Sequence, residues 1–214
     1  MASDASPYTA EQIETGRKLF VGDVDFVKGV VNMRGLPDDD RGEVAFAGRS
    51  NVGKSSLINA LTNRAKLARA STEPGRTREI NYFDLAKGAF YLVDLPGFGY
   101  AKVSKTQSEA WIKLTKNYLR GRASLRRVFL LIDSRRGIGK PDEEVMKLLD
   151  TSAVIYQVVL TKIDKLKKGE AEVIKEKTET ALKTHGAAHP VVMLTSSEKG
   201  WGIPELRTEI AGLV

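Results

Sequence analysis

The sequence predicts a three-layer α/β fold, in which a six-stranded, mostly parallel sheet carries one antiparallel edge strand and has helices on both faces. Short apolar runs alternate with amphipathic stretches along the chain, and such repeated strand–helix units form parallel sheets. Runs such as VFLLI and VVL are apolar at every position, which is typical of strands buried on both faces. The predicted strands span residues 43–47, 80–85, 89–94, 127–133, 154–160 and 191–195.

Two of the predicted strands are too close in the sequence to be parallel. Only the tripeptide 86–88 separates residues 80–85 from 89–94, whereas a parallel crossover needs about a dozen residues. We therefore expect an antiparallel hairpin at one edge of the sheet. Ligands of such sheets bind beyond the carboxyl ends of the strands, so functional residues are expected in the loops there. The predicted helices span residues 54–63, 107–121, 142–150, 169–185 and 203–212.

The composition is that of a globular protein without a membrane span. Of the 214 residues, 42% are hydrophobic and 29% charged, none is cysteine, and no apolar run approaches the ~18 residues of a spanning helix. We expect one domain, residues 23–214, after a polar N-terminal extension, residues 1–22. The extension is either flexible or a short helix opened by a capping box at Thr9 and Gln12. It lacks a secretory signal, so we predict a cytoplasmic location, and we expect a monomer.

The first predicted strand leads into a phosphate-binding motif. Residues 48–55 read GRSNVGKS and fit G-x-x-x-x-G-K-[ST] between a strand and a helix, which predicts a P-loop nucleotide-binding fold. The glycines let backbone N–H groups converge on phosphate oxygens, and the helix N-terminus adds positive charge. Lys54 is expected to contact the β and γ phosphates, and Ser55 to bind Mg²⁺. The predicted contacts are Gly48, Arg49, Ser50, Asn51, Val52, Gly53, Lys54, Ser55 and Ser56.

Three later strands end in loops that can supply the remaining contacts. DLPG, residues 94–97, combines an aspartate suited to Mg²⁺ with a glycine whose N–H can sense a γ-phosphate. In TKID, residues 161–164, the carboxylate can accept the ring N–H and the exocyclic amine of guanine, a donor pair that adenine lacks. Small residues at 195–197 can turn backbone amides towards the guanine carbonyl. The predicted contacts are Asp94, Leu95, Pro96, Gly97, Thr161, Lys162, Ile163, Asp164, Thr195, Ser196 and Ser197.

These loops together resemble those of the translation-factor-like branch of the P-loop GTPases, from about Glu43 to the C-terminus. Longer stretches are similar to the EngB family (also called YihA or YsxC), bacterial GTPases of large ribosomal subunit assembly. They read VAFAGRSNVGKSSLINAL, STEPGRTREINYF, LVDLPGFGYAKVSK, LIDSRRGI and LTKID, of which GFGYA at 97–101 is the most family-specific. Thr161 stands where most GTPases have Asn, a change that the family shares. Its hydroxyl can still tie loops together, with fewer hydrogen bonds.

The resemblance also implies switch and catalytic residues. The first switch falls on residues 74–77, where Thr77 would give Mg²⁺ a ligand beside Ser55 and Asp94. Phe98 occupies the position at which Ras-like enzymes have a water-orienting Gln, so we predict slow intrinsic GTP hydrolysis. Asn51 either holds a potassium ion against the phosphates or is a polar filler in a tight loop. The predicted catalytic residues are Lys54, Thr77, Gly97 and Asn51, and the first-switch contacts are Gly75, Arg76, Thr77, Arg78 and Glu79.

The charge and the resemblance together predict the partner. A net charge of +7 is compatible with a polyanion, and the family implies ribosomal RNA and the large ribosomal subunit or its precursor, with no DNA specificity and no membrane. A GTP-dependent switch acting on a protein effector, a tRNA-modification domain and a nucleotide-binding module without turnover are the alternatives. The basic residues either form one phosphate-binding surface or are solvated helix ends and loops: Arg120, Arg122, Arg126, Arg127, Arg135, Arg136, Lys140, Lys162, Lys165, Lys167 and Lys168, beside Tyr100, Lys102 and Lys105.

Overall fold

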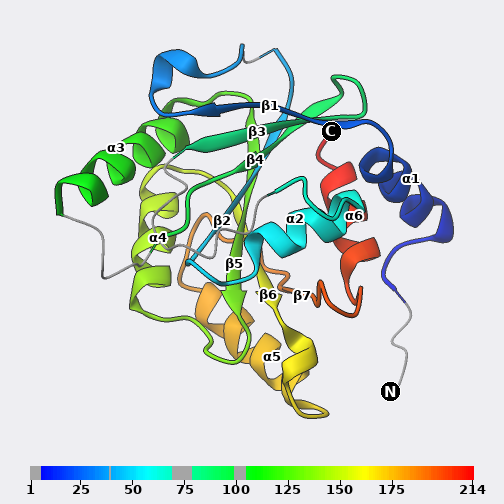
Figure 1. Ribbon diagram of the computed structural model, residues 1–214. Helices are drawn as coiled ribbons and strands as arrows, with labels where there is room; N and C mark the ends of the chain where they lie inside the picture. The colour runs from blue at the N-terminus through cyan, green and yellow to red at the C-terminus, as the bar shows by residue number, and fades with distance from the viewer. Residues whose placement is uncertain (1–5, 39, 69–78, 99–104) are drawn as a thin grey trace.

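The computed structural model describes residues 6–38, 40–68, 79–98 and 105–214, with residues 105–112 described by their backbone alone. Its centre is a seven-stranded sheet of order β1-β3-β4-β2-β5-β6-β7 (Figure 1). The predicted α/β class and the antiparallel hairpin β3–β4 are confirmed. The strands are β1 (Val24–Val30), β2 (Glu43–Gly48), β3 (Ile80–Leu85), β4 (Phe90–Asp94), β5 (Leu125–Asp133), β6 (Tyr156–Thr161) and β7 (Met193–Leu194).

The prediction of six strands missed β1, which pairs antiparallel with β3 and forms the edge of the sheet. The hairpin therefore lies one strand inside the edge. Sequence patterns hide β1 because only its terminal residues Val24 and Val30 are buried, while Phe26 and Val27 are exposed. A half-exposed edge strand has neither a continuous apolar run nor a clean alternation.

Two helical layers cover the sheet, and alternate residues of each strand face opposite layers. On β2, Ala45 and Ala47 belong to the core beneath α3, α4 and α5, whereas Val44 and Phe46 belong to the core beneath α1, α2 and α6 (Figure 1). This double burial explains why β2 is apolar from Val44 to Ala47. The helices are α1 (Ala10–Val21), α2 (Lys54–Thr62), α3 (Lys105–Gly121), α4 (Lys140–Thr151), α5 (Glu170–Leu182) and α6 (Ile203–Ala211).

The N-terminal residues include the helix α1, which packs on α6. The capping box at Thr9 and Gln12 is present, and Phe20 is fully buried. A Cβ atom added to Gly16 would lie 2.8 Å from the backbone nitrogen of Thr208, so the two helices approach too closely for a larger residue. The division of the chain at residue 22 stays a prediction.

Among the residues that the structure describes, no helix is both long enough and apolar enough to cross a membrane.

Candidate nucleotide-binding site

The predicted phosphate loop, residues 48–55, joins the carboxyl end of β2 to α2. Gly53 has a φ of 105° and Asn51 a φ of 63°, so the backbone curls through left-handed conformations before the helix begins at Lys54. Glycine at position 53 has no side chain to cap the first N–H groups of α2. These N–H groups, with the positive end of the helix, are suited to bind an anion.

Asp94 lies beside the start of α2. It ends β4, and its carboxylate forms an ion pair with the Lys54 ammonium, both side chains being largely buried at 7% and 11% exposure. The pair places a carboxylate next to the turn that holds Ser55. Carboxylate and hydroxyl oxygens are the donors that Mg²⁺ prefers, so the residues present fit this ion.

The DLPG segment lies against the phosphate loop. The Ser50 N–H donates to the Phe98 carbonyl (3.1 Å), and the Phe98 N–H donates to the Gly48 carbonyl (3.2 Å). A Cβ atom on Gly97 would lie 3.0 Å from the Ser50 hydroxyl oxygen and 3.3 Å from the Ser50 Cα, so the two segments approach each other closely at this glycine. The Phe98 ring is buried in the core beneath α3 to α5. It cannot orient a water molecule, as expected from its chemistry.

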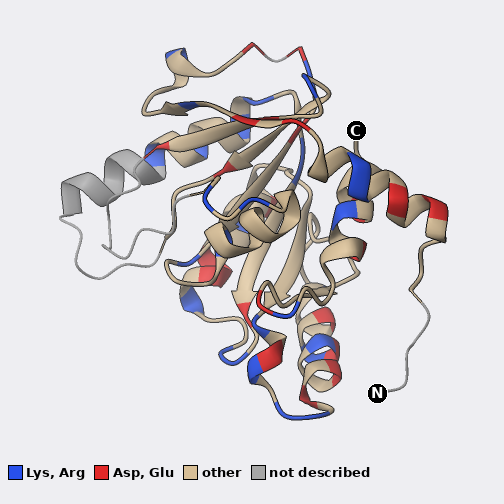
Figure 2. Cartoon of the chain, turned by 45° about the vertical axis from the view of Figure 1, so that its right-hand side comes forward, with Lys and Arg blue, Asp and Glu red and all other residues tan. Residues whose placement is uncertain are grey.

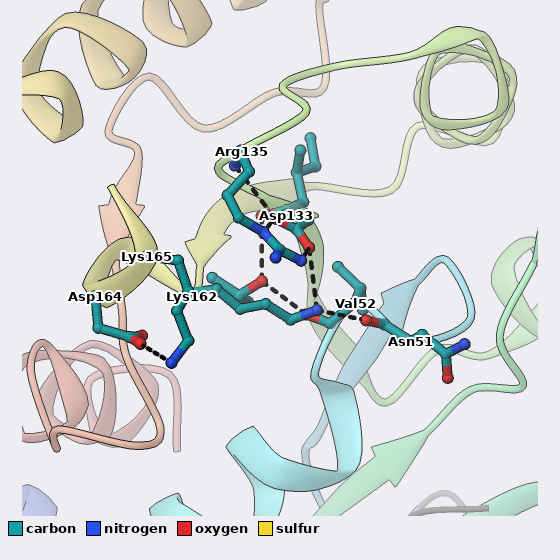
Figure 3. A network of polar contacts seen from close by, with 9 residues as sticks. Asn51, Val52, Asp133, Arg135, Lys162, Asp164 and Lys165 are labelled. Atoms are coloured by element: carbon teal, nitrogen blue, oxygen red, sulfur yellow. Dashed lines mark hydrogen bonds and ion pairs between the residues drawn. The ribbon is translucent and has the colours of Figure 1, made fainter. Parts of the chain in front are cut away.

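The TKID loop is tied to the phosphate loop by two consecutive contacts (Figure 3). The Thr161 hydroxyl donates to the Val52 carbonyl (2.7 Å), and the Lys162 ammonium donates to the Asn51 carbonyl (2.6 Å). The prediction that the Thr161 hydroxyl ties loops together is therefore confirmed. Two backbone carbonyls of the phosphate loop are held by neighbouring residues at the end of β6.

Asp164 is held as a charged acceptor. Its side chain is 4% exposed, accepts a hydrogen bond from the Ser196 hydroxyl (2.6 Å) and lies 3.0 Å from the Lys165 ammonium. Burial opposes ionisation, but the Ser196 hydrogen bond and Lys165 outweigh it and keep the pKa of the Asp164 carboxyl below its usual value. A charged carboxylate is the form needed to accept two N–H donors from guanine.

The loop that begins at Thr195 packs against the TKID loop. The Ile163 N–H donates to the Thr195 carbonyl (3.3 Å), and the Ser196 N–H donates to the Trp201 carbonyl (2.9 Å). Both Thr195 and Ser196 are fully buried, so their positions are set by packing as well as by these bonds. The structure therefore brings the four predicted loops together at one edge of the sheet.

The predicted first switch falls mostly outside the described residues. Gly75, Arg76, Thr77 and Arg78 are not described, and Glu79 is an exposed residue directly before β3. The roles assigned to these residues stay predictions.

Sequence reasoning gave no role to Asp133, which ends β5. Its carboxylate lies 3.0 Å from the Lys162 ammonium and 2.7 Å from the Arg135 guanidinium (Figure 3). A pocket of about 310 Å³ opens here, lined by residues of the phosphate loop, the segment after β5 and Lys162. The available signal was an aspartate at the end of a buried strand, as at Asp94.

The predicted basic residues divide between two edges of the sheet. Arg122 is buried against Glu43 at the amino end of β2, and Arg127 pairs with Glu209 (2.6 Å) near the amino end of β5. The reading in which all of these residues form one basic surface is therefore wrong for these two, because the buried Glu43 and the partly buried Glu209 neutralise them at the opposite edge.

Arg120 lies in the last turn of α3, and Arg126 lies at the amino end of β5. Tyr100 and Lys102 fall outside the described residues, and the side chain of Lys105 is not described. The other cations of the set follow the carboxyl ends of β5 and β6 in the chain, and Lys and Arg are blue in Figure 2: Arg135, Arg136, Lys140, Lys162, Lys165, Lys167 and Lys168.

Replacing Thr161 with valine is expected to weaken GDP binding about fivefold. The valine keeps the shape of the side chain but leaves the Val52 carbonyl without its hydroxyl donor, a loss of about 1 kcal/mol. The rate at which a fluorescent GDP analogue dissociates measures the effect. The matched control is Thr178→Val, because the Thr178 hydroxyl bonds a helix carbonyl within α5 (2.7 Å). Equal dissociation rates for wild type and Thr161→Val would show that the hydrogen bond between Thr161 and Val52 does not contribute to GDP binding.

Comparison with known proteins agrees with this geometry. A family model for 50S ribosome-binding GTPases matches residues 43–162, and a model for the elongation factor Tu GTP-binding domain matches residues 112–214. A crystal structure of a probable GTP-binding protein EngB has a TM-score of 0.62 and 26% identity, covering 80% of this chain and 98% of that one. The fold and the loops thus define a P-loop GTPase, an enzyme that binds and hydrolyses GTP.

The particular family follows from closer relatives. The probable GTP-binding protein EngB of Hyphomonas neptunium is 68% identical over 214 residues, covering 99% of this chain and 97% of that protein. The probable GTP-binding protein EngB of Caulobacter vibrioides is 54% identical over 98% of this chain and 91% of that protein. The chain belongs to the EngB family of GTP-binding proteins.

Proposed function

We propose that this GTPase acts in the cytoplasm as a nucleotide-gated factor in large ribosomal subunit assembly, and that normal cell division and septation depend on it. The observation that carries the proposal is the match of residues 43–162 to 50S ribosome-binding GTPases. A second likeness supports an RNA partner. A crystal structure of Era with MgGDPNP and part of 16S ribosomal RNA has a TM-score of 0.64 and 27% identity, over 80% of this chain and 56% of that one.

The charge at the nucleotide-binding edge also supports an RNA partner. The exposed cations Arg136 and Lys140 follow β5, and Lys167 and Lys168 follow β6, so both pairs come after strands that end at the nucleotide-binding edge. Cations gathered at one edge can contact several backbone phosphates, and such binding weakens as salt rises. A surface beside the nucleotide is also where a change of nucleotide can alter partner binding.

Co-sedimentation with purified large ribosomal subunits tests this function. We expect more protein in the pellet with a non-hydrolysable GTP analogue than with GDP, and less in both states as salt is raised. The variant Arg136→Glu with Lys140→Glu should reduce binding, whereas Lys18→Glu, in the last turn of α1, should not. Absence of binding in both nucleotide states would contradict the proposal and favour a switch that acts on a protein effector.

Magnesium is the proposed cofactor of GTP binding. Ser55 and Asp94 supply suitable oxygen ligands within the described residues, and Thr77 is the third proposed ligand. Bound there, Mg²⁺ would neutralise charge between the β and γ phosphates. Lys54, released from Asp94, would then contact the same phosphates. The segments around Thr77 and Gly97 would be held in place while the γ-phosphate is bound, and hydrolysis would release them.

Potassium is a further proposed cofactor, bound through Asn51. The Asn51 backbone is fixed in a left-handed conformation by its carbonyl contact with Lys162, which leaves its exposed side chain to act separately. We expect GTP hydrolysis to be at least about tenfold faster in potassium than in sodium at equal ionic strength. Asn51→Ala should erase this difference. Equal rates for the wild-type protein in both salts would contradict the assignment.

A further inference from the structure

Asp133 connects the end of β5 to the nucleotide-binding loops. Its side chain is only 10% exposed, and one carboxylate oxygen lies 3.0 Å from the Lys162 ammonium. The other oxygen accepts from the Arg135 side chain (2.9 Å) and from the Arg135 N–H (3.1 Å). Arg135 therefore orients the carboxylate, and Figure 3 shows it directed towards Lys162.

Lys162 carries this connection onwards to the phosphate loop. Its ammonium donates to the Asn51 carbonyl (2.6 Å), and a Cβ atom on Gly53 would lie 3.6 Å from the Lys162 Cε. The lysine stem thus lies directly beside the loop that is expected to surround the phosphates. A free lysine side chain is flexible and loses rotamer entropy when it is fixed in one position. An oriented carboxylate at the end of the stem offsets this cost before any nucleotide is bound.

The backbone at both ends of the contact needs such support. Asn51 and Lys162 have φ values of 63° and 60°, a left-handed conformation that is uncommon for residues other than glycine. Such a conformation carries a free-energy cost and persists only where its surroundings hold it. Because the hydrogen bond joins these two residues, losing the Lys162 contact would relax both loops.

Asp133 is charged at neutral pH. Burial opposes its ionisation, but hydrogen bonds from Arg135 and Lys162 outweigh burial and hold the pKa of the Asp133 carboxyl well below its usual range. The contact with Lys162 is therefore a charge-assisted hydrogen bond.

We propose that Asp133 is a positioning residue for the nucleotide, which fixes Lys162 on the Asn51 carbonyl and so sets the spacing between the phosphate loop and the base-binding loop. The inference concerns nucleotide affinity and does not depend on the ribosomal target. Asp133 touches neither phosphate nor base in this role; it acts entirely through Lys162.

A double-mutant cycle on GDP affinity tests the proposal. We expect Asp133→Ala and Lys162→Met each to raise the Kd for GDP about tenfold. The Kd of the double variant for GDP should also be about tenfold above that of wild type, because both changes remove the same contact. An Asp133→Ala variant within twofold of wild type would overturn the proposal. So would a double variant whose loss is the product of the two single losses.

Two controls separate positioning from general damage. Asp150→Ala removes a comparable carboxylate, bonded to His185 at 2.6 Å, and is expected to leave the Kd for GDP unchanged. If Asp133→Ala does not fold, the same cycle is run with Asp133→Asn, which keeps the volume and one oxygen acceptor. Asp133→Asn should raise the Kd for GDP about threefold in the otherwise wild-type protein. No further rise when it is combined with Lys162→Met supports the proposal, and the same rise in that combination overturns it.

Discussion

Replacing Lys54 with alanine is expected to lower both GTP affinity and the hydrolysis rate by about 100-fold. In the structure the Lys54 ammonium is already fixed beside the first turn of α2 by its ion pair with Asp94. A short movement would bring it from this carboxylate to phosphate oxygens. Charge on the transferring phosphoryl group grows in the transition state, so removal of this cation affects hydrolysis as well as binding.

Hydrolysis by the Lys54→Ala variant is measured by phosphate release, and GTP affinity by titration. The change leaves Asp94 buried without its cation, so a lower thermal midpoint is expected and the assays belong well below it. Lys66→Ala removes an exposed lysine that follows α2 and should leave both quantities unchanged. Hydrolysis within threefold of wild type would show that Lys54 is not the phosphate contact.

Replacing Asp164 with asparagine is expected to lower GTP affinity by about 100-fold and to raise the affinity for xanthosine triphosphate. The Asp164 carboxylate offers two acceptors, which match the ring N–H and the amine of guanine. Asparagine offers one acceptor and one donor. Xanthine has a carbonyl in place of the amine, so it matches asparagine and not aspartate.

Competition against a fluorescent GDP measures this exchange of preference. The amide still accepts from Ser196, so the loop that begins at Thr195 should keep its position. The matched control is Asp23→Asn, an exposed aspartate before β1 that pairs with Lys87 (3.2 Å), and it should bind GTP as wild type does. If Asp164→Asn lowered the affinities for GTP and for xanthosine triphosphate equally, the result would indicate a damaged loop and not a changed base contact.

The loops could be predicted from sequence because each follows a buried strand. The run from Val44 to Ala47 is apolar throughout, and the glycines and lysine that follow it form a pattern specific to phosphate binding. Asp94 ends a buried strand and Asp164 comes shortly after one, so their order along the chain was enough to place them at one edge. The strand β1 was missed because its buried and exposed residues follow no simple period.

Contacts between side chains could not be predicted in this way. Asp133 and Lys162 are separated by 29 residues, and only the pairing of β5 with β6 brings them together. The charge pattern was also misleading at Arg122 and Arg127, whose partners Glu43 and Glu209 are distant in sequence. Sequence shows which residue types are present at the ends of strands, but their pairing depends on the register of the sheet.

The most direct test of the account is a competition titration of the purified protein with a fluorescent GDP, displaced by GTP, GDP, ATP or ADP in magnesium. The four loops predict that both guanine nucleotides displace the probe, and that adenine nucleotides are at least about 1,000-fold weaker. Displacement by ADP at concentrations similar to GDP would contradict the assignment of Asp164 to the base. The structure would then explain phosphate binding but not the selection of guanine.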